Sequence, residues 1–183
     1  DDPEADELLT PDHELYNHML IIDNVPGEGE AEALRMSPNR IQAIIQEANM
    51  THFKGKPAAV VAIDHLGILE VDDDAPAEIR GSENMRPGYI MQRLFAVAKT
   101  TSVFMMVLQQ LPKEVEPGVA FGYDAGRGGS QQTDFCDYIF QILRPEQRGD
   151  LDDTERAQYS GQYKLALGKN RYGPSRVAHL LFD

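Results

Sequence analysis

One carboxylate follows directly on a continuous apolar segment of the chain. Residues 58–63 read Ala-Ala-Val-Val-Ala-Ile, and Asp64 comes next. A carboxylate at the carboxyl end of a buried strand can hold a magnesium ion through water, beside nucleotide phosphates. Asp64 is therefore a candidate Walker B residue. The alternative is an aspartate that only caps the end of a strand.

A pair of amides follows a second apolar segment. Residues 102–108 read Ser-Val-Phe-Met-Met-Val-Leu, and Gln109 and Gln110 come next. An amide at the tip of a strand beside Asp64 could sense a γ-phosphate or orient the attacking water, and Gln110 is the candidate. The alternative is a solvated glutamine. Ligands of open α/β sheets bind at the carboxyl ends of the strands, so we expect Asp64 and Gln110 to face one crevice.

Two cations lie in a short turn near residue 170. The sequence Lys169-Asn170-Arg171-Tyr172-Gly173-Pro174 separates the apolar segments 163–167 and 177–182, which predicts a β-hairpin with a basic tip. Lys169 and Arg171 are two positions apart, so on extended backbone they project to one side. Such cations can reach the nucleotide of a neighbouring subunit as an arginine finger does. A solvated basic turn is the alternative. With no acidic residue between positions 164 and 169, we expect the two cations to have no buried structural role.

Strands and helices must alternate to position these groups. Ser37 and Pro38 are typical of an N-cap and a first helical residue, and Ile41, Ile44, Ile45 and Ala48 follow at helical spacing. The continuous apolar strands should be buried on both faces, as in a parallel sheet. The acidic runs at 72–74 and 150–153 should be solvated loops. The predicted strands cover 18–23, 58–64, 102–108, 136–143 and the hairpin, and the predicted helices cover 37–48 and 89–101.

Composition limits the class of protein. The chain has 183 residues, a net charge of -13 and a single cysteine, Cys136, which excludes an internal disulfide and a cysteine-based zinc site. No apolar stretch is long enough for a membrane span, and the acidic start is not a signal peptide, so we expect a cytoplasmic domain. The acidic charge speaks against a broad nucleic-acid surface but leaves room for a narrow site.

Four segments, taken in order over residues 18–183, resemble the ATPase motor domain of the DnaB-type replicative helicases. The most specific of the four is the Lys-Asn-Arg-x-Gly-Pro hairpin, Lys169 to Pro174, with Phe182-Asp183 after it. The three looser segments are Ala62-Ile63-Asp64-His65-Leu66, Leu108-Gln109-Gln110-Leu111-Pro112-Lys113, and Gly129-Ser130-Gln131-Gln132-Thr133-Asp134-Phe135-Cys136-Asp137 with the strand to Arg144.

The resemblance implies a RecA-like α/β fold: a mostly parallel sheet with helices on both faces and a C-terminal antiparallel hairpin. Residues 1–17 would be a polar lead-in and 18–183 the ATPase core. The resemblance also implies ATP and Mg²⁺ as cofactors, a homo-oligomeric ring such as a hexamer, translocation on single-stranded DNA, and a primase or loader as partner. Asp64 would hold Mg²⁺ through water, Gln110 would sense phosphate, and Lys169 and Arg171 would act across a subunit interface. Residues 117–129 would face the channel, with Arg127, Gly128 and Gly129 at the DNA.

The chain departs from that family in one respect that matters most. No G-x-x-x-x-G-K-[ST] sequence occurs, so the backbone cradle, lysine and hydroxyl of a phosphate-binding loop are missing from these residues. We expect a piece of a longer protein, and we expect the isolated chain to bind ATP weakly or not at all. A non-catalytic RecA-fold scaffold is one alternative. A RecA- or RadA-like recombinase or a helicase-loader ATPase is another, and the basic hairpin favours a helicase over these.

Overall fold

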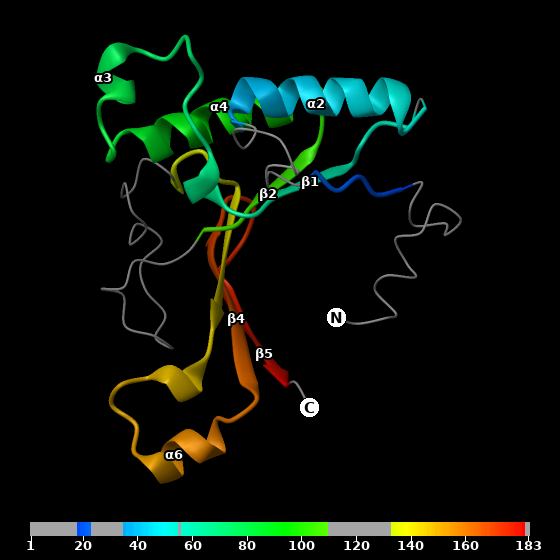
Figure 1. Cartoon of the computed structure of the whole chain (residues 1–183). Helices are drawn as coiled ribbons and strands as arrows, with labels where there is room; N and C mark the ends of the chain where they lie inside the picture. Colours follow the sequence, from blue (N-terminus) through cyan, green and yellow to red (C-terminus); the bar gives the residue numbers. More distant parts are fainter. Residues whose placement is uncertain (1–17, 23–34, 55, 110–132, 182–183) are drawn as a thin grey trace, which may run out of the picture. The chain divides into compact units, whose positions relative to one another are not determined.

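A computed structural model of the chain describes residues 18–22, 35–54, 56–109 and 133–181. The chain divides into two compact units. The first comprises residues up to 81 together with 93–108, and the second comprises 82–92 and the residues from 109 onward. The helix α4 (Arg86–Thr101) belongs to both units (Figure 1). Two small sheets organise the described residues, and they position the candidate groups separately.

A parallel strand pair forms the sheet of the first unit. β1 (Val60–Ile63) pairs with β2 (Phe104–Val107) in a register that runs from Val60↔Phe104 to Ile63↔Val107. The helix α2 (Pro38–Thr51) and residues 93–101 of α4 lie on one side of these strands (Figure 1). The two apolar runs therefore form strands as predicted, and the helices supply the first unit with its core. The buried apolar residues include Ile41, Ile45, Ala48, Ile63, Leu94, Val97 and Val103.

The start of α2 follows the sequence signals. The hydroxyl of Ser37 accepts a hydrogen bond from the Arg40 backbone N–H at 3.4 Å, and Pro38 occupies the first turn. Ile41, Ile45 and Ala48 are buried at a spacing of three and four residues, which is the apolar stripe of an amphipathic helix. The predicted helix is confirmed and extends to Thr51.

The outer face of the β1–β2 pair differs from the prediction. Side chains on that face are exposed, with Val60 at 58%, Phe104 at 54% and Met106 at 48%. The expectation of strands buried on both faces, with helices on both sides, is wrong for the described residues, because α2 and α4 cover one side of the pair.

The predicted strand at 18–23 is also wrong where the structure describes it. Residues 18–22 form no strand, and Met19, Leu20, Ile21 and Ile22 are exposed. An apolar run becomes a strand only where a neighbouring strand takes up its backbone hydrogen bonds. Among the described residues, none pairs with this segment.

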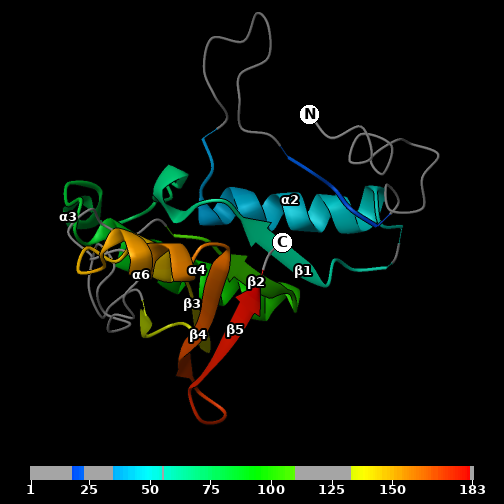
Figure 2. The ribbon, with the colours of Figure 1, turned by 90° about the horizontal axis from the view of Figure 1, so that it is seen from below.

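An antiparallel sheet organises the second unit. β3 (Tyr138–Leu143), β4 (Gln162–Asn170) and β5 (Arg176–Leu181) lie side by side in that order (Figure 2). The register shifts between Ile139, which pairs with Lys169, and Phe140, which pairs with Leu167, and this marks a bulge at Gly168 of β4. The predicted C-terminal hairpin is confirmed as β4–β5. The predicted mostly parallel sheet is not what the described strands form, since β1–β2 is their one parallel pair.

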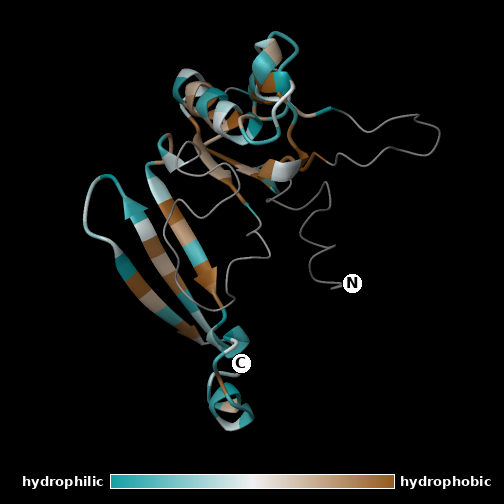
Figure 3. Cartoon of the chain, turned by 90° about the vertical axis from the view of Figure 1, so that its left-hand side faces the viewer, coloured by the Kyte–Doolittle hydropathy of each residue, from teal (hydrophilic) through white to brown (hydrophobic). Residues whose placement is uncertain are grey.

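β3 carries mostly apolar side chains, whereas β4 and β5 mix polar and apolar ones (Figure 3). On one face Gln141, Leu143 and Ala166 are buried, whereas Phe140 and Ile142 on the other face are 56% and 70% exposed. Segment 145–160 contains two short helices, and the second begins at Asp153, so the expectation of a loop over 150–153 is wrong at its last residue. The remaining short elements are η2 (Leu66–Ile68), α3 (Ala77–Arg80), η3 (Pro145–Gln147) and α6 (Asp153–Gln158), the last with a capping box between Asp152 and Glu155.

Candidate functional site

Asp64 lies at the carboxyl end of the parallel pair, where the sequence predicted it. The hydrogen-bond ladder continues beyond the strands: Leu108 N–H donates to the Ile63 carbonyl at 2.9 Å, and Leu66 N–H donates to the Leu108 carbonyl at 2.8 Å. These two bonds bring the segment that follows β1 against the end of β2. Asp64 is exposed, so its carboxylate faces solvent at the sheet edge where ligands of parallel sheets bind.

The predicted partner of Asp64 is not placed by the structure. Gln109 follows Leu108 directly and is exposed. Gln110, the residue proposed to sense phosphate, lies outside the described residues, as do Arg127, Gly128 and Gly129 of the predicted channel loop. The common crevice for Asp64 and Gln110 therefore remains a prediction.

His65 has a structural task beside Asp64. The peptide bond between the two residues is cis. The imidazole Nδ1 of His65 accepts a hydrogen bond from the Gly67 backbone N–H at 2.9 Å and so caps η2. A Cβ atom on Gly67 would lie 2.7 Å from the ring, so glycine lets the imidazole occupy this position. This hydrogen bond holds the turn after Asp64 in place, and it uses Nδ1 of the His65 ring as the acceptor.

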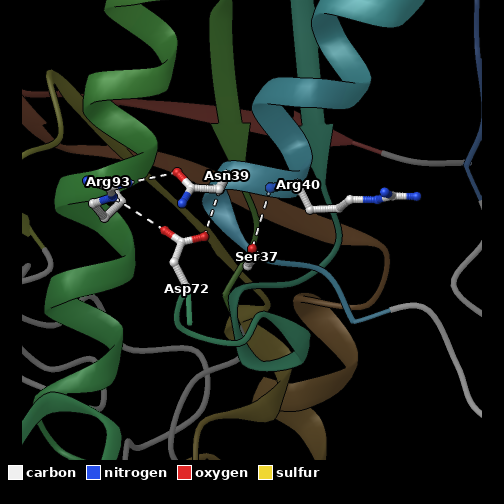
Figure 4. A network of polar contacts seen from close by, with 5 residues as sticks. All are labelled: Ser37, Asn39, Arg40, Asp72 and Arg93. Atoms are coloured by element: carbon white, nitrogen blue, oxygen red, sulfur yellow. Dashed lines mark hydrogen bonds and ion pairs between the residues drawn. The ribbon is translucent and has the colours of Figure 1, made fainter. Parts of the chain in front are cut away.

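A buried aspartate braces the segment that follows this turn (Figure 4). Asp72 is 2% exposed, and its carboxylate accepts a hydrogen bond from the Asn39 backbone N–H at 2.8 Å and one from Arg93 Nε at 3.3 Å. Arg93 Nη2 also donates to Asn39 Oδ1 at 2.7 Å. The carboxylate therefore caps the first turn of α2, where a negative charge is favourable, and joins it to α4.

The prediction of a solvated acidic run is wrong at Asp72. Asp73 and Asp74 are exposed as expected. The partners of Asp72 lie 33 and 21 positions away in the sequence, so no local pattern distinguishes it from its two neighbours.

The basic hairpin is held by one turn of the same unit. Lys169 Nζ donates to the Thr133 carbonyl at 2.6 Å, and Arg171 Nη2 donates to the Asp134 carbonyl at 3.0 Å. Arg171 Nη1 lies 2.9 Å from Asp137 Oδ1 in an ion pair. Neither cation is buried, but both have partners, which come from residues 133–137 and not from the neighbouring strand positions where the sequence analysis looked for an acidic residue.

Asn170 organises the tip between the two cations. Its side-chain oxygen accepts from the Tyr172 backbone N–H at 3.1 Å, and its side-chain nitrogen donates to the Pro174 carbonyl at 3.2 Å. A Cβ on Gly173 would approach Asn170 Nδ2 to 3.1 Å, so the turn is tight at that position. Asn170 thus fixes the loop geometry. The side chain of Arg171 is 42% exposed, and Tyr172 as a whole residue is 69% exposed.

The thiol of Cys136 lies within electrostatic reach of the hairpin. Burial raises its pKa above the ordinary value, the Lys169 ammonium opposes that rise, and the Asp137 carboxylate adds to it. The thiol is therefore protonated at neutral pH. Cys136 is therefore a small, largely apolar side chain and not a nucleophile.

The described residues fit only part of a magnesium–nucleotide site. No three His, Cys, Asp or Glu side chains gather there as metal ligands. A single exposed carboxylate such as Asp64 suits contact with Mg²⁺ through water, and the sequence contains no phosphate-binding loop beside it. None of the helices in the described ranges has the length and apolar character needed to cross a membrane.

Comparison with known proteins finds likeness in structure alone. No family model matches the sequence, and no curated protein does. A solved ATPase domain of a DnaB-like replicative helicase matches with a TM-score of 0.64 and 20% identity, over 82% of this chain and 50% of that one. A second DnaB-like replicative helicase, described with its interactions with primase, matches with a TM-score of 0.65 and 19% identity, over 83% of this chain and 35% of that one. The chain thus spans half or less of each of these proteins.

The resemblance inferred from the sequence motifs is confirmed at the level of the fold. Both matches extend over more than four fifths of the chain. The chain has the α/β fold of the ATPase domain of DnaB-like replicative helicases, over a part of that domain.

Proposed function

We propose that the chain is part of the ATPase motor of a ring-forming DNA helicase, which couples ATP hydrolysis to movement along single-stranded DNA. The observation that carries the proposal is the exposed Asp64 carboxylate at the carboxyl end of the β1–β2 pair, in a chain with a helicase ATPase fold. A carboxylate at that edge can hold Mg²⁺ through water while the metal bridges nucleotide phosphates.

The remaining roles follow from the same motor. Gln110 would sense the γ-phosphate, and Lys169 and Arg171 would stabilise the charge that develops on phosphate in a neighbouring subunit. Arg127, Gly128 and Gly129 would contact single-stranded DNA in the channel. Residues outside this sequence would complete a mostly parallel RecA-like sheet and supply the phosphate-binding loop. We use the term assembled motor for the protein in which this chain is joined to the segment that carries the phosphate-binding loop.

Assembly and partners belong to the proposal as well. A residue that acts on a neighbour's nucleotide requires at least two copies, and a closed ring such as a hexamer gives every copy the same interface. The DnaB-like helicase that matches this fold was described with its interactions with primase. A primase, or a loader that opens the ring, is the partner we propose here.

A non-catalytic scaffold is the second candidate. Two observations favour it: the sequence has no phosphate-binding loop, and Arg171 is paired with Asp137. A scaffold would keep the fold and its interfaces while hydrolysing nothing. The two candidates differ in what the Asp64 carboxylate does.

The Asp64→Asn variant of the assembled motor separates the candidates. Loss of the charge should weaken the hold on Mg²⁺ and lower ATP turnover by about 10²-fold or more. Asp74→Asn is the matched control, because Asp74 is an exposed aspartate of the same unit outside the site. Turnover measured against Mg²⁺ concentration decides the question. If the two variants hydrolyse ATP equally well, Asp64 is not the metal carboxylate and the scaffold is favoured.

A further inference from the structure

One short turn contacts both hairpin cations. The carbonyl of Thr133 accepts from Lys169 Nζ at 2.6 Å, and the carbonyl of Asp134 accepts from Arg171 Nη2 at 3.0 Å. Asp137, at the end of this turn, directly precedes β3. It contacts Arg171 twice: the Asp137 carbonyl accepts from the Arg171 backbone N–H at 2.9 Å, and its carboxylate lies 2.9 Å from Nη1.

The two contacts of Asp137 hold Arg171 at both ends. The backbone bond sets where the side chain begins, and the charge attraction to Asp137, together with the Nη2 bond to the Asp134 carbonyl, keeps the guanidinium at the tip. The Asp137 side chain is 28% exposed, so the pair is partly shielded from water and the attraction is stronger than between two fully solvated charges. The Arg171 side chain keeps 42% of its surface exposed, which leaves part of the guanidinium open to a further anion.

We propose that Asp137 is a positioning residue for Arg171, a role that rests on the proposed function. Asp137 holds the guanidinium at the tip of the hairpin, with its exposed part directed to the phosphate of a nucleotide in an adjoining subunit. A cation already held in place does not have to be ordered during the reaction, and preorganised charge stabilises a transition state more effectively than a mobile one. Asp137 itself touches neither nucleotide nor metal.

An ion pair that restrained Arg171 away from the phosphate would have the opposite effect on ATP turnover. If the ion pair kept Arg171 away from the phosphate, removal of the carboxylate would release the finger and raise turnover. The geometry points to positioning, because the backbone bond between Arg171 and Asp137 remains when the carboxylate is changed. The guanidinium then loses its ion pair and keeps only the Nη2 bond to the Asp134 carbonyl.

ATP turnover by the assembled motor tests the role. Asp137→Asn keeps the shape and removes the charge, and we expect kcat to fall by about 10- to 100-fold while KM for MgATP stays unchanged. Asp137→Glu restores the carboxylate and should recover part of kcat. Asp150→Asn breaks the exposed Arg148–Asp150 pair of the same unit and should turn over as wild type. The double variant Arg171→Ala/Asp137→Asn should be no slower than Arg171→Ala alone.

NMR of the chain itself gives a readout independent of catalysis. The Nη–H protons of Arg171 should exchange more slowly with water in the wild type than in Asp137→Asn, with the backbone amide signals unchanged. If exchange is the same in both, the ion pair does not restrain Arg171 and the role is overturned. Should Asp137→Asn fail to fold, the same comparison with Asp137→Ser, which also lacks the carboxylate, decides.

The kinetic outcomes separate this role from the proposed function. If Arg171→Ala hydrolyses ATP normally, Arg171 is not a finger, and its role in the proposed function falls together with the positioning role. If Arg171→Ala is inactive while Asp137→Asn turns over at or above the wild-type rate, the positioning role alone is overturned.

Discussion

The carboxylate of Asp72 and the guanidinium of Arg93 form the most deeply buried ion pair among the described residues, with Oδ2 and Nε 3.3 Å apart. The Asp72 side chain is 1% exposed, whereas Arg93 is 36% exposed. The other oxygen of Asp72 caps the first turn of α2. One carboxylate thus holds together a loop and two helices around the segment that follows Asp64.

Asp72→Ala should destabilise the chain. The change leaves the Asn39 N–H without its acceptor and Arg93 without its anion, and we expect a loss of about 2–3 kcal/mol in the free energy of unfolding, reduced from the value for a fully buried pair because Arg93 is partly solvated. Asp72→Asn keeps an acceptor for the N–H and should lose about 1 kcal/mol. Urea unfolding followed by circular dichroism measures both.

Asp73 supplies the control for that series. It is exposed and adjacent in sequence, so Asp73→Ala should change the free energy of unfolding by less than about 0.5 kcal/mol. Equal midpoints for the Asp72→Ala and Asp73→Ala variants would contradict the buried network of Figure 4.

Gly67→Ala should disturb the turn after Asp64. The added Cβ would lie 2.7 Å from the His65 ring, so the imidazole must rotate and give up its bond to residue 67. A loss of about 1–2 kcal/mol in stability is expected from the broken cap and the clash. Thermal unfolding of the two single variants and of the double variant with His65→Ala measures the coupling.

Two comparisons decide whether the stability lost in Gly67→Ala comes from the clash with the His65 imidazole. In the His65→Ala background, Gly67→Ala should cost little more, because the clash partner is gone. Gly81→Ala is the matched glycine change: its Cβ would lie 3.4 Å from the Ala77 carbonyl at ordinary φ, and it should be tolerated. A fully additive double variant would show that His65 and Gly67 do not interact.

Local sequence patterns predicted the elements whose signals lie within a few residues. Ser37-Pro38 with the apolar spacing up to Ala48 gave α2, and the two short apolar runs gave β1 and β2. The placement of Asp64 at a strand end followed from the same local pattern. These features need no knowledge of the rest of the chain.

Features that depend on distant partners were missed. Asp72 looks like a solvated charge until its partners on α2 and α4 are in place. Lys169 and Arg171 found their partners 36 and 37 positions away, beyond the reach of any local charge pattern. The segment 18–22 is apolar enough for a strand, but pairing depends on a neighbour and not on composition.

Cys136 should react slowly with iodoacetamide in the folded chain at pH 7.5. Burial raises the pKa of its thiol, so the reactive thiolate is scarce, and the rate should keep rising at alkaline pH after the unfolded chain in urea has levelled off. Because the pKa is raised on folding, the protonated thiol contributes stability below the unfolded pKa, and that contribution is lost as pH rises toward the folded one. Equal rate–pH profiles for folded and unfolded chains would contradict the burial.

Mixing two inactive variants of the assembled motor tests whether Asp64 and Arg171 act across subunits. Arg171→Ala removes the finger, which can be worth about 10³-fold or more in turnover, and Asp64→Ala removes the carboxylate for Mg²⁺. Each variant alone should lose ATPase and unwinding while ring assembly is kept.

Mixed rings give the diagnostic result. If Arg171 of one copy serves the nucleotide held near Asp64 of the next, some interfaces in a mixed ring combine an intact Asp64 with an intact Arg171, and part of the ATPase activity should return. Activity is measured across mixing ratios and should be highest near equal amounts. The pairing across subunits is excluded if no mixture exceeds the activity of either variant alone, since a finger acting within its own subunit would leave every site in the ring defective.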